Sequence, residues 1–224
     1  LRGYTALLAA EHDDSGKDFH EGFDLALDLD SSDEDVKSGV FGYGPNQWPS
    51  GRESFKSALL NYHSSMVDFG KKIFESFALA LELPINHFEG AITKPMAHMR
   101  VLHYPPQDPK SGTEQMGIGA HSDYECFTIL CTSDVPALQV LNTDGVWIEA
   151  PPIEGAFIVN VGDLMARWTN DYFQSTVHRA INLSGRRRYS IPFFYGPNSK
   201  EIIEVLKKYN IPLIMDSAIN SANC

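Results

Sequence analysis

The strongest constraint on the fold is an alternation of apolar and polar residues that begins after Pro95. Eight short runs, rich in β-branched and aromatic residues and separated by turn residues, predict strands. These are Ala97–Tyr104, Gly119–Asp123, Glu125–Cys131, Leu138–Leu141, Val146–Glu149, Ala156–Val161, Thr176–Ile181 and Arg188–Phe194. No segment of helix length separates them, which disfavours a parallel sheet with crossover helices. The pattern favours a mainly β fold with flanking helices, a double-stranded β-helix or jelly roll.

One long helix is predicted ahead of these strands. From Ser50 to Leu83 apolar residues recur at spacings of three and four, which predicts a helix over about 52–83 with one apolar stripe. The stripe consists of Phe55, Leu59, Tyr62, Met66, Phe69, Ile73 and Phe77. Ser50 and Glu53 fit a capping box, and Pro84 ends the run. The heptad-like spacing leaves a coiled coil as an alternative, but no sustained charged pattern flanks the stripe, which favours a helix packed on one sheet.

Composition narrows the class of protein. A chain of 224 residues is expected to form a single domain over 1–224, with loops dominating residues 1–48. The net charge is −11, and residues 1–35 hold eleven acids against Arg2 and Lys17, which argues against nucleic acid as a partner.

Location and partners follow from the same composition. No apolar run is long enough to predict a membrane span, and no secretory leader is recognisable. Three cysteines do not make a disulfide framework and favour a reducing, cytoplasmic location. We expect a monomer that binds a small molecule and neither nucleic acid nor membrane.

Two histidines and an aspartate form the candidate metal site. His121 and Asp123 stand two apart on a predicted strand, so their side chains project to one face and can reach the same ion. A third ligand must come from another strand, and His178 lies on one. Two imidazoles and a carboxylate leave half the coordination sphere of a ferrous ion open for a co-substrate and oxygen, as in non-haem iron(II) oxygenases.

A second His-x-Asp sequence shows how little this motif means alone. His12-Asp13-Asp14 has the same spacing, but it sits in an acidic, glycine-containing loop with no apolar strand around it. We interpret it as a chance match.

A candidate carboxylate clamp distinguishes iron from hydrolytic zinc, which also accepts two imidazoles and a carboxylate. Arg188 and Ser190 stand two apart on a predicted strand, so a guanidinium and a hydroxyl would share one face. Such a pair can hold the carboxylate of a keto-acid, which hydrolytic zinc chemistry does not need. Arg186 and Arg187 fit a basic turn instead.

The ordered set of motifs resembles the isopenicillin N synthase-like group of 2-oxoglutarate/iron(II) oxygenases. The segment from Met116 to Asp123 resembles the family's Leu-Gly-x-Gly-x-His-Thr-Asp, and Phe127 to Leu130 resembles its Leu-Thr-Ile-Leu. Further similar motifs are Leu138-Gln139-Val140 with Trp147, Val159 to Asp163, Trp168-Thr169-Asn170, His178-Arg179 and Arg188-x-Ser190. The resemblance covers about residues 1–198.

The resemblance implies an enzyme, a 2-oxoglutarate-dependent Fe(II) dioxygenase of secondary metabolism. Its Fe(II) would be held by His121, Asp123 and His178. The distal carboxylate of 2-oxoglutarate would be held by Arg188, Ser190 and Tyr104, the last of which stands where the family carries Asn-Tyr-Tyr-Pro. With O2, and with ascorbate as a candidate reductant, such enzymes convert 2-oxoglutarate to succinate while they hydroxylate, desaturate or cyclise a small organic molecule.

Two departures from the family pattern leave alternatives open. The family has a segment before Arg2-Gly3-Tyr4 that this sequence is expected to lack, and residues 199–224 form a divergent tail. One alternative is a 2-oxoglutarate-independent iron oxidase of the same fold, in which the arginine–serine pair holds the substrate's own carboxylate or bicarbonate. The other is a truncated, non-catalytic remnant that binds a ligand.

Overall fold

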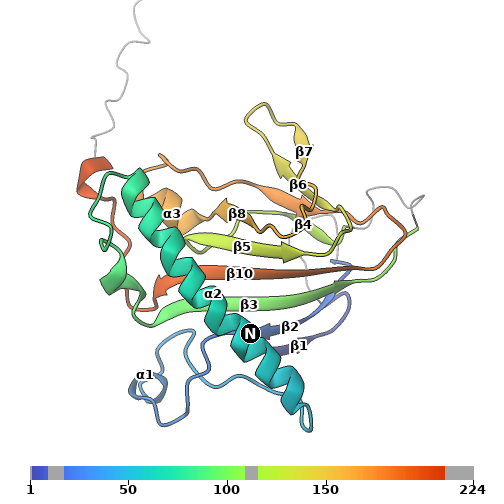
Figure 1. Ribbon diagram of the computed structural model, residues 1–224, viewed down its shortest axis with the longest axis horizontal. Coiled ribbons are helices and arrows are strands. Elements are labelled where there is room, and N and C mark those ends of the chain that lie inside the picture. The colour runs from blue at the N-terminus through green and yellow to red at the C-terminus, as the bar shows by residue number, and fades with distance from the viewer. Residues whose placement is uncertain (1, 10–17, 109–115, 210–224) are drawn as a thin grey trace, which may run out of the picture.

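The computed structural model describes residues 2–9, 18–108 and 116–209 as two antiparallel sheets and a long helix (Figure 1). The larger sheet has the strand order β1 (Gly3–Thr5), β2 (Glu21–Leu25), β3 (Pro95–Tyr104), β10 (Arg188–Asn198), β5 (Phe127–Thr132) and β8 (Ile158–Val161). The smaller sheet has the order β4 (Ile118–His121), β9 (His178–Ala180), β6 (Leu138–Leu141) and β7 (Trp147–Glu149). Strands of both sheets line one cavity. This arrangement confirms the predicted jelly roll.

The eight predicted strands are all present; Leu138–Leu141 has the predicted ends, and the others have shifted ends. The main correction concerns β4, which ends at His121 instead of continuing to Asp123. The chain turns there because the Asp123 carbonyl accepts a hydrogen bond from the Asp163 backbone nitrogen at 2.8 Å, outside any strand ladder. At the other extreme, β10 continues past Phe194 to Asn198, because those residues keep pairing with β3.

The loop prediction for residues 1–48 is wrong in part. This region contributes β1, β2 and a short helix, α1 (Glu34–Lys37). β2 pairs with β3, so that Asp24 lies opposite Arg100, and β1 covers the other edge of β2. Strands of three and five residues are too short to stand out by alternation, and the partner that stabilises them lies far along the chain. Three further short elements were not predicted: η1 (Glu89–Ile92), α3 (Asp163–Trp168) and η3 (Lys207–Tyr209).

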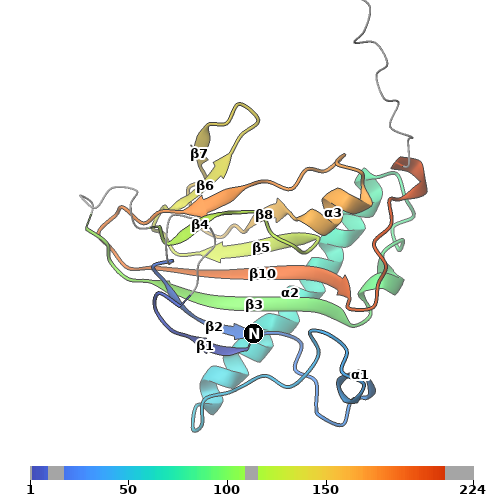
Figure 2. The ribbon, with the colours of Figure 1, turned by 180° about the vertical axis from the view of Figure 1, so that it is seen from behind.

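Helix α2 (Glu53–Ala80) lies across the outer face of the larger sheet, as both ribbon views show (Figures 1 and 2). This confirms packing on a sheet over a coiled coil. The buried line is rotated from the predicted stripe, since Phe55 and Phe69 are 36% and 39% exposed. The residues that are buried are His63, Met66, Gly70, Phe74 and Ala78. The predicted capping box is absent, because Arg52 is the N-cap and makes no side-chain capping bond.

The end of α2 also differs from the predicted end at 83. The Leu83 backbone nitrogen donates to the Ala78 carbonyl at 2.8 Å, and Glu82 adopts a left-handed conformation with φ of 54°. This hydrogen bond closes the helix as a Schellman-type turn. The chain therefore leaves the helix before it reaches Pro84.

A glycine sets the distance between α2 and the sheet. A Cβ atom at Gly70 would lie 2.2 Å from Cδ2 of Tyr195, so only glycine fits where the helix crosses β10. Tyr195 is fully buried there, and its hydroxyl donates to the Val67 carbonyl of α2 at 3.3 Å.

The strands of the larger sheet separate two environments. Met99, Ile129 and Phe193 project outward and pack with α2 in the main hydrophobic core. The residues that alternate with them, such as Leu102 and Ser190, line the cavity toward the smaller sheet. The sheet therefore supplies stability on one face and a functional surface on the other.

Two expectations from composition can be compared with the structure. Cys126 and Cys131 are free thiols, as expected for a chain without a disulfide framework. Within the described ranges, no helix has the length and apolar character that crossing a membrane requires.

Candidate metal centre

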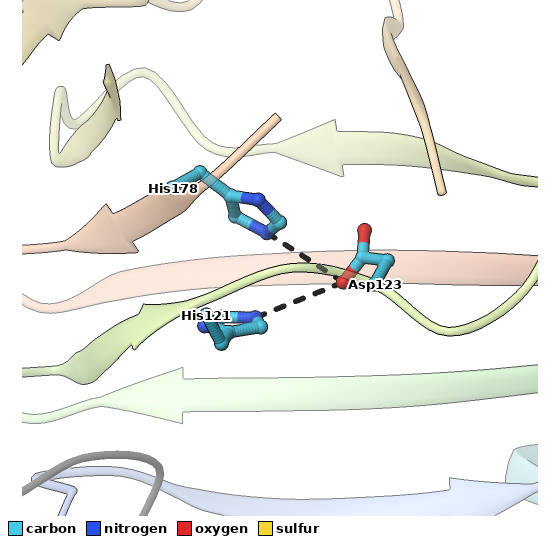
Figure 3. Close-up of side chains that lie close together, drawn as sticks. All are labelled: His121, Asp123 and His178. Carbon is cyan, nitrogen blue, oxygen red and sulfur yellow. Dashed lines mark ion pairs between the residues drawn. The ribbon is translucent and has the colours of Figure 1, made fainter. Parts of the chain in front are cut away.

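Strand pairing brings the two candidate histidines together. In the smaller sheet β4 pairs with β9, so that His121 lies directly opposite His178. The centroids of their rings are 4.4 Å apart. Asp123 reaches the same place from the turn that follows β4, and not from the strand itself as the sequence predicted. Figure 3 shows the three side chains converging from these separate segments.

The three residues present one ligand atom each to a common point. All three atoms lie within 4.8 Å of one another. Oδ1 of Asp123 is 3.7 Å from Nε2 of His121 and 3.6 Å from Nε2 of His178 (Figure 3). Two imidazole nitrogens and one carboxylate oxygen on one side form the donor set that ferrous iron accepts in non-haem oxygenases, so the residues fit that metal.

Backbone carbonyls fix which nitrogen of each ring faces the site. Nδ1 of His121 lies 2.8 Å from the Gly119 carbonyl, and Nδ1 of His178 lies 3.0 Å from the Thr176 carbonyl. A carbonyl only accepts hydrogen bonds, so each Nδ1 carries the proton. Nε2 of each neutral ring is left with a lone pair for a metal.

The carboxylate of Asp123 is oriented in the same way. Its Oδ2 accepts hydrogen bonds from the Thr128 hydroxyl and, at 2.7 Å, from Nδ2 of Asn160. The residue is only 4% exposed, so solvent does not compete for these bonds. Oδ1 therefore points to the histidines. The sequence analysis placed Thr128 and Asn160 in family-like motifs but gave them no role at the metal site. They lie opposite each other on β5 and β8.

A glycine holds the turn that carries Asp123. A Cβ atom at Gly162 would lie 2.1 Å from the Glu125 carbonyl oxygen and 2.9 Å from that of Asp123. The Gly162 nitrogen also donates to the Cys126 carbonyl at 2.9 Å. The close approach of the two backbones fixes the position of the Asp123 turn.

The predicted carboxylate clamp lies deeper in the same cavity. Arg188 pairs with Tyr104 across β10 and β3, and each is 2% exposed. The Ser190 hydroxyl donates to the Tyr104 hydroxyl at 3.4 Å, and the Arg188 guanidinium lies 4.7 Å from the Tyr104 ring centroid. Nε and Nη1 of Arg188 are buried and have no hydrogen-bond partner among the described residues. A buried guanidinium with unsatisfied donors is suited to a carboxylate ligand.

Both groups open into one cavity of about 990 Å³. Its lining also includes three polar residues that the sequence pattern did not single out: Asp24, His98 and Arg100. Burial on its own raises the pKa of Asp24, but the hydrogen bond from His98 and the charge of Arg100 outweigh it and lower that pKa. Glu125 lines the cavity as well, and burial raises its pKa.

The second His-x-Asp sequence cannot be compared with this site. His12, Asp13 and Asp14 lie outside the described residues.

Comparisons with known proteins agree with the geometry. Residues 95–197 match a family model described as the 2OG-Fe(II) oxygenase superfamily. The chain is 36% identical over 212 residues to a 2-oxoglutarate-Fe(II) type oxidoreductase of Emericella nidulans, a match that covers 92% of this chain and 60% of that protein. It is 37% identical over 213 residues to a homoarginine-6-hydroxylase of Glycine max, covering 92% and 63%. The chain thus spans about three fifths of the length of these curated relatives.

A solved structure shows the same fold. A 2OG-Fe(II) oxygenase family protein from Caulobacter crescentus is similar with a TM-score of 0.81 and 30% sequence identity, and the match covers 94% of this chain and 68% of that one.

Proposed function

The chain belongs to the 2OG-Fe(II) oxygenase superfamily, and from that premise we propose that it is a 2-oxoglutarate-dependent Fe(II) dioxygenase of small organic molecules. The observation that carries the proposal is the convergence of His121, Asp123 and His178, whose ligand atoms lie within 4.8 Å of one another. In the hydroxylation version, 2-oxoglutarate, O2 and a C–H bond give succinate, CO2 and an alcohol. Desaturation or cyclisation would leave the second oxygen atom in water.

The three residues would hold Fe(II) through Nε2 of both histidines and Oδ1 of Asp123. The iron would supply the activation of oxygen and the electron transfers, which side chains alone do not perform. The chain itself orients the donor atoms, because the Gly119 and Thr176 carbonyls hold the rings and Asn160 holds the carboxylate. Such support preserves both ligand geometry and metal affinity.

Arg188, Ser190 and Tyr104 would bind the distal carboxylate of 2-oxoglutarate. Their burial supports this role, since a carboxylate placed there loses its water and gains charge-assisted hydrogen bonds from Arg188. The unsatisfied Nε and Nη1 atoms of Arg188 are the donors available to it. The same cavity extends to the three candidate metal ligands, so one keto-acid can reach both groups.

We further propose a cytoplasmic monomer with one catalytic domain over 1–224. The sharing of one sheet by β1, near the start of the chain, and β10 supports a single domain. The free thiols of Cys126 and Cys131 are compatible with a reducing compartment. The name of the Glycine max relative makes homoarginine the first small molecule to test as a substrate.

The test is an anaerobic titration of the protein with Fe(II) and 2-oxoglutarate, followed by a succinate assay in air. We expect a weak visible absorption band that needs both ligands, a rise in melting temperature, and iron-dependent release of succinate. Iron-dependent turnover without succinate would favour the 2-oxoglutarate-independent oxidase. The absence of both the band and the thermal shift would favour the non-catalytic remnant.

A further inference from the structure

A buried polar cluster lies on the inner face of the larger sheet, where β2 meets β3. Asp24 and Arg100 are opposite each other in the strand register, and His98 stands two residues before Arg100 on the same face. Nε of Arg100 lies 2.8 Å from Oδ1 of Asp24, and Nε2 of His98 lies 3.3 Å from that oxygen. All three residues line the 990 Å³ cavity, and none of them belongs to the metal or 2-oxoglutarate groups described above.

The cluster has more hydrogen-bond donors than acceptors. Both carboxylate oxygens of Asp24 are occupied, because Oδ2 accepts from the Thr5 hydroxyl at 3.1 Å while Oδ1 faces Arg100 and His98. The side chain of Arg100 is only 15% exposed, yet its guanidinium makes the ion pair with Asp24 and no hydrogen bond to any other residue that the structure describes. Since Nε faces Asp24, the four N–H groups of the two terminal amino nitrogens are available to an acceptor on a ligand.

Arg100 cannot serve the co-substrate site of Arg188. Arg188 pairs with Tyr104, and Arg100 stands four residues before Tyr104 on β3. At about 3.3 Å per residue, the Cα atoms of Arg100 and Tyr104 are separated by roughly 13 Å along the strand. The cavity lining contains three arginines, of which Arg179 is hydrogen-bonded to Gln139. Of Arg100 and Arg188, only Arg188 is used by 2-oxoglutarate in the proposed function.

The position of the cluster relative to the metal ligands limits the size of a bound molecule. His98 on β3 lies opposite Phe194 on β10, which lies opposite Thr128 on β5. Thr128 in turn donates to the metal-facing carboxylate of Asp123. Two strand spacings of about 4.8 Å therefore separate the polar cluster from the edge of the metal site. Phe194 and Pro192 provide an apolar floor between them.

We propose that Arg100 binds a carboxylate of the organic substrate and that Asp24 holds the guanidinium in place for it. This inference rests on the proposed function and adds a substrate class to it: small carboxylic acids, of about amino-acid size, whose oxidised carbon lies across Phe194 from the carboxylate. Asp24 keeps Arg100 paired before the substrate arrives, which lowers the cost of burying the charge. The terminal amino groups of Arg100 then match the two oxygens of a carboxylate.

The experiment uses the protein loaded with Fe(II) and saturating 2-oxoglutarate under argon, so that the Arg188 site is filled. Calorimetry would measure the binding of homoarginine, 3-phenylpropionate and octanoate, each beside its methyl ester, which keeps the shape but removes the charge. We expect at least one acid to bind and its ester to bind roughly tenfold to a hundredfold more weakly, as for the loss of charged hydrogen bonds. If no acid binds, or if the esters bind as well as the acids, the inference is wrong.

Variants assign the effect to the cluster. Arg100→Gln should weaken the binding of the acid by the same factor. The visible band of the iron–2-oxoglutarate complex and the affinity for 2-oxoglutarate should stay unchanged. Because this change leaves Asp24 buried without a counter-charge, the double variant Asp24→Asn/Arg100→Gln, which carries no unpaired charge, repeats the test. Arg186→Gln is the control, since the Arg186 side chain is exposed and forms its ion pair with Asp134, whose side chain is also exposed. Unaltered acid binding in the double variant would overturn the proposal, whereas a wild-type protein that forms no iron–2-oxoglutarate band would instead refute the proposed function.

Discussion

At the residue scale, the candidate metal site depends on hydrogen bonds that leave one atom of each ligand free for an ion. Oδ2 of Asp123 is held by Thr128 and Asn160, while the backbone holds Nδ1 of His121 and of His178. These bonds come from the chain's own backbone and side chains, and we infer that they preorganise the site. Their removal should therefore reduce metal affinity without unfolding the chain.

Asn160→Ala tests this preorganisation. Loss of its hydrogen bond lets the Asp123 carboxylate rotate, and we expect iron affinity to fall by roughly tenfold to a hundredfold, as for other groups that orient metal ligands. The measurement is competition for Fe(II) against a chelator under argon. Asn61→Ala, at an exposed position of α2, is the control. Equal iron affinity in the two variants would show that Asn160 does not orient the ligand.

Arg188→Ala tests the co-substrate clamp. Removing the buried guanidinium should raise the concentration of 2-oxoglutarate needed for half-maximal succinate release on the order of a hundredfold, because a charged hydrogen-bond pair is lost. Iron affinity should change little, since Arg188 pairs with Tyr104 in the larger sheet, whereas His121 and His178 belong to the smaller one.

Arg186→Ala is the matched control for Arg188. Arg186 and its partner Asp134 are both exposed, and an ion pair on the surface contributes little to stability. A variant at Arg188 that loses iron together with 2-oxoglutarate would contradict separate roles for the two groups.

The residues of the candidate site could be identified from the sequence, but their surroundings could not. His121 and Asp123 were expected on one strand because they stand two apart, yet Asp123 reaches the site from a turn. Alternation along a strand predicts which side chains share a face. It does not predict where the strand ends, since that depends on the hydrogen bond from Asp163, far along the sequence.

At the scale of elements, the contact between α2 and β10 positions the sheet. Gly70→Ala would place a methyl group within 2.2 Å of the Tyr195 ring, which is fully buried and cannot move aside freely. We expect the free energy of unfolding to fall by about 1–3 kcal/mol, as for an overpacked core, despite the better helix propensity of alanine. Chemical denaturation would measure the change.

Gly90→Ala is the control for the helix contact. A Cβ atom at Gly90, in η1, would meet nothing within 4 Å, so this variant should be as stable as the wild type or slightly more stable. Equal stability of the Gly70→Ala and Gly90→Ala variants would contradict the close packing of Gly70 against the Tyr195 ring.

Long elements were predictable and short ones were not. The long helix and the eight strands after Pro95 follow from periodicity, which their length makes statistically clear. β1 and β2 were missed because they are stabilised by pairing with β3 and not by their own composition. The buried residues of α2 differ from the predicted stripe because packing against the sheet, and above all against Tyr195, determines which face of the helix is covered.

At the scale of the whole molecule, polar residues on the inner face of the larger sheet, such as Asp24, contribute to stability as well as to the proposed binding site. The lowered pKa of Asp24 means that the unfolded chain binds its proton more tightly than the folded chain does. The contribution of ionised Asp24 to stability is therefore present above the ordinary pKa of 3.8 and is lost as the pH falls through the lower, folded value.

Melting temperatures between about pH 5 and pH 3 test this linkage. We expect Asp24→Asn to be less stable than the wild type at pH 7 and to lose less stability on acidification. The wild type also contains other carboxylates with lowered pKa. Only the difference between wild type and variant in the slope of melting temperature against pH therefore reports on Asp24. Parallel slopes would show that Asp24 is not specifically stabilised in its ionised form.

The most direct test of the central claim is the position of one bound metal. A crystal grown anaerobically with Fe(II) and 2-oxoglutarate, with diffraction recorded across the iron absorption edge, locates the ion without assumptions about activity. We predict a single anomalous peak shared by Nε2 of His121, Nε2 of His178 and Oδ1 of Asp123, and none in crystals of Asp123→Ala. An iron atom bound elsewhere, or a peak that survives the loss of Asp123 unchanged, would contradict the assignment of this site.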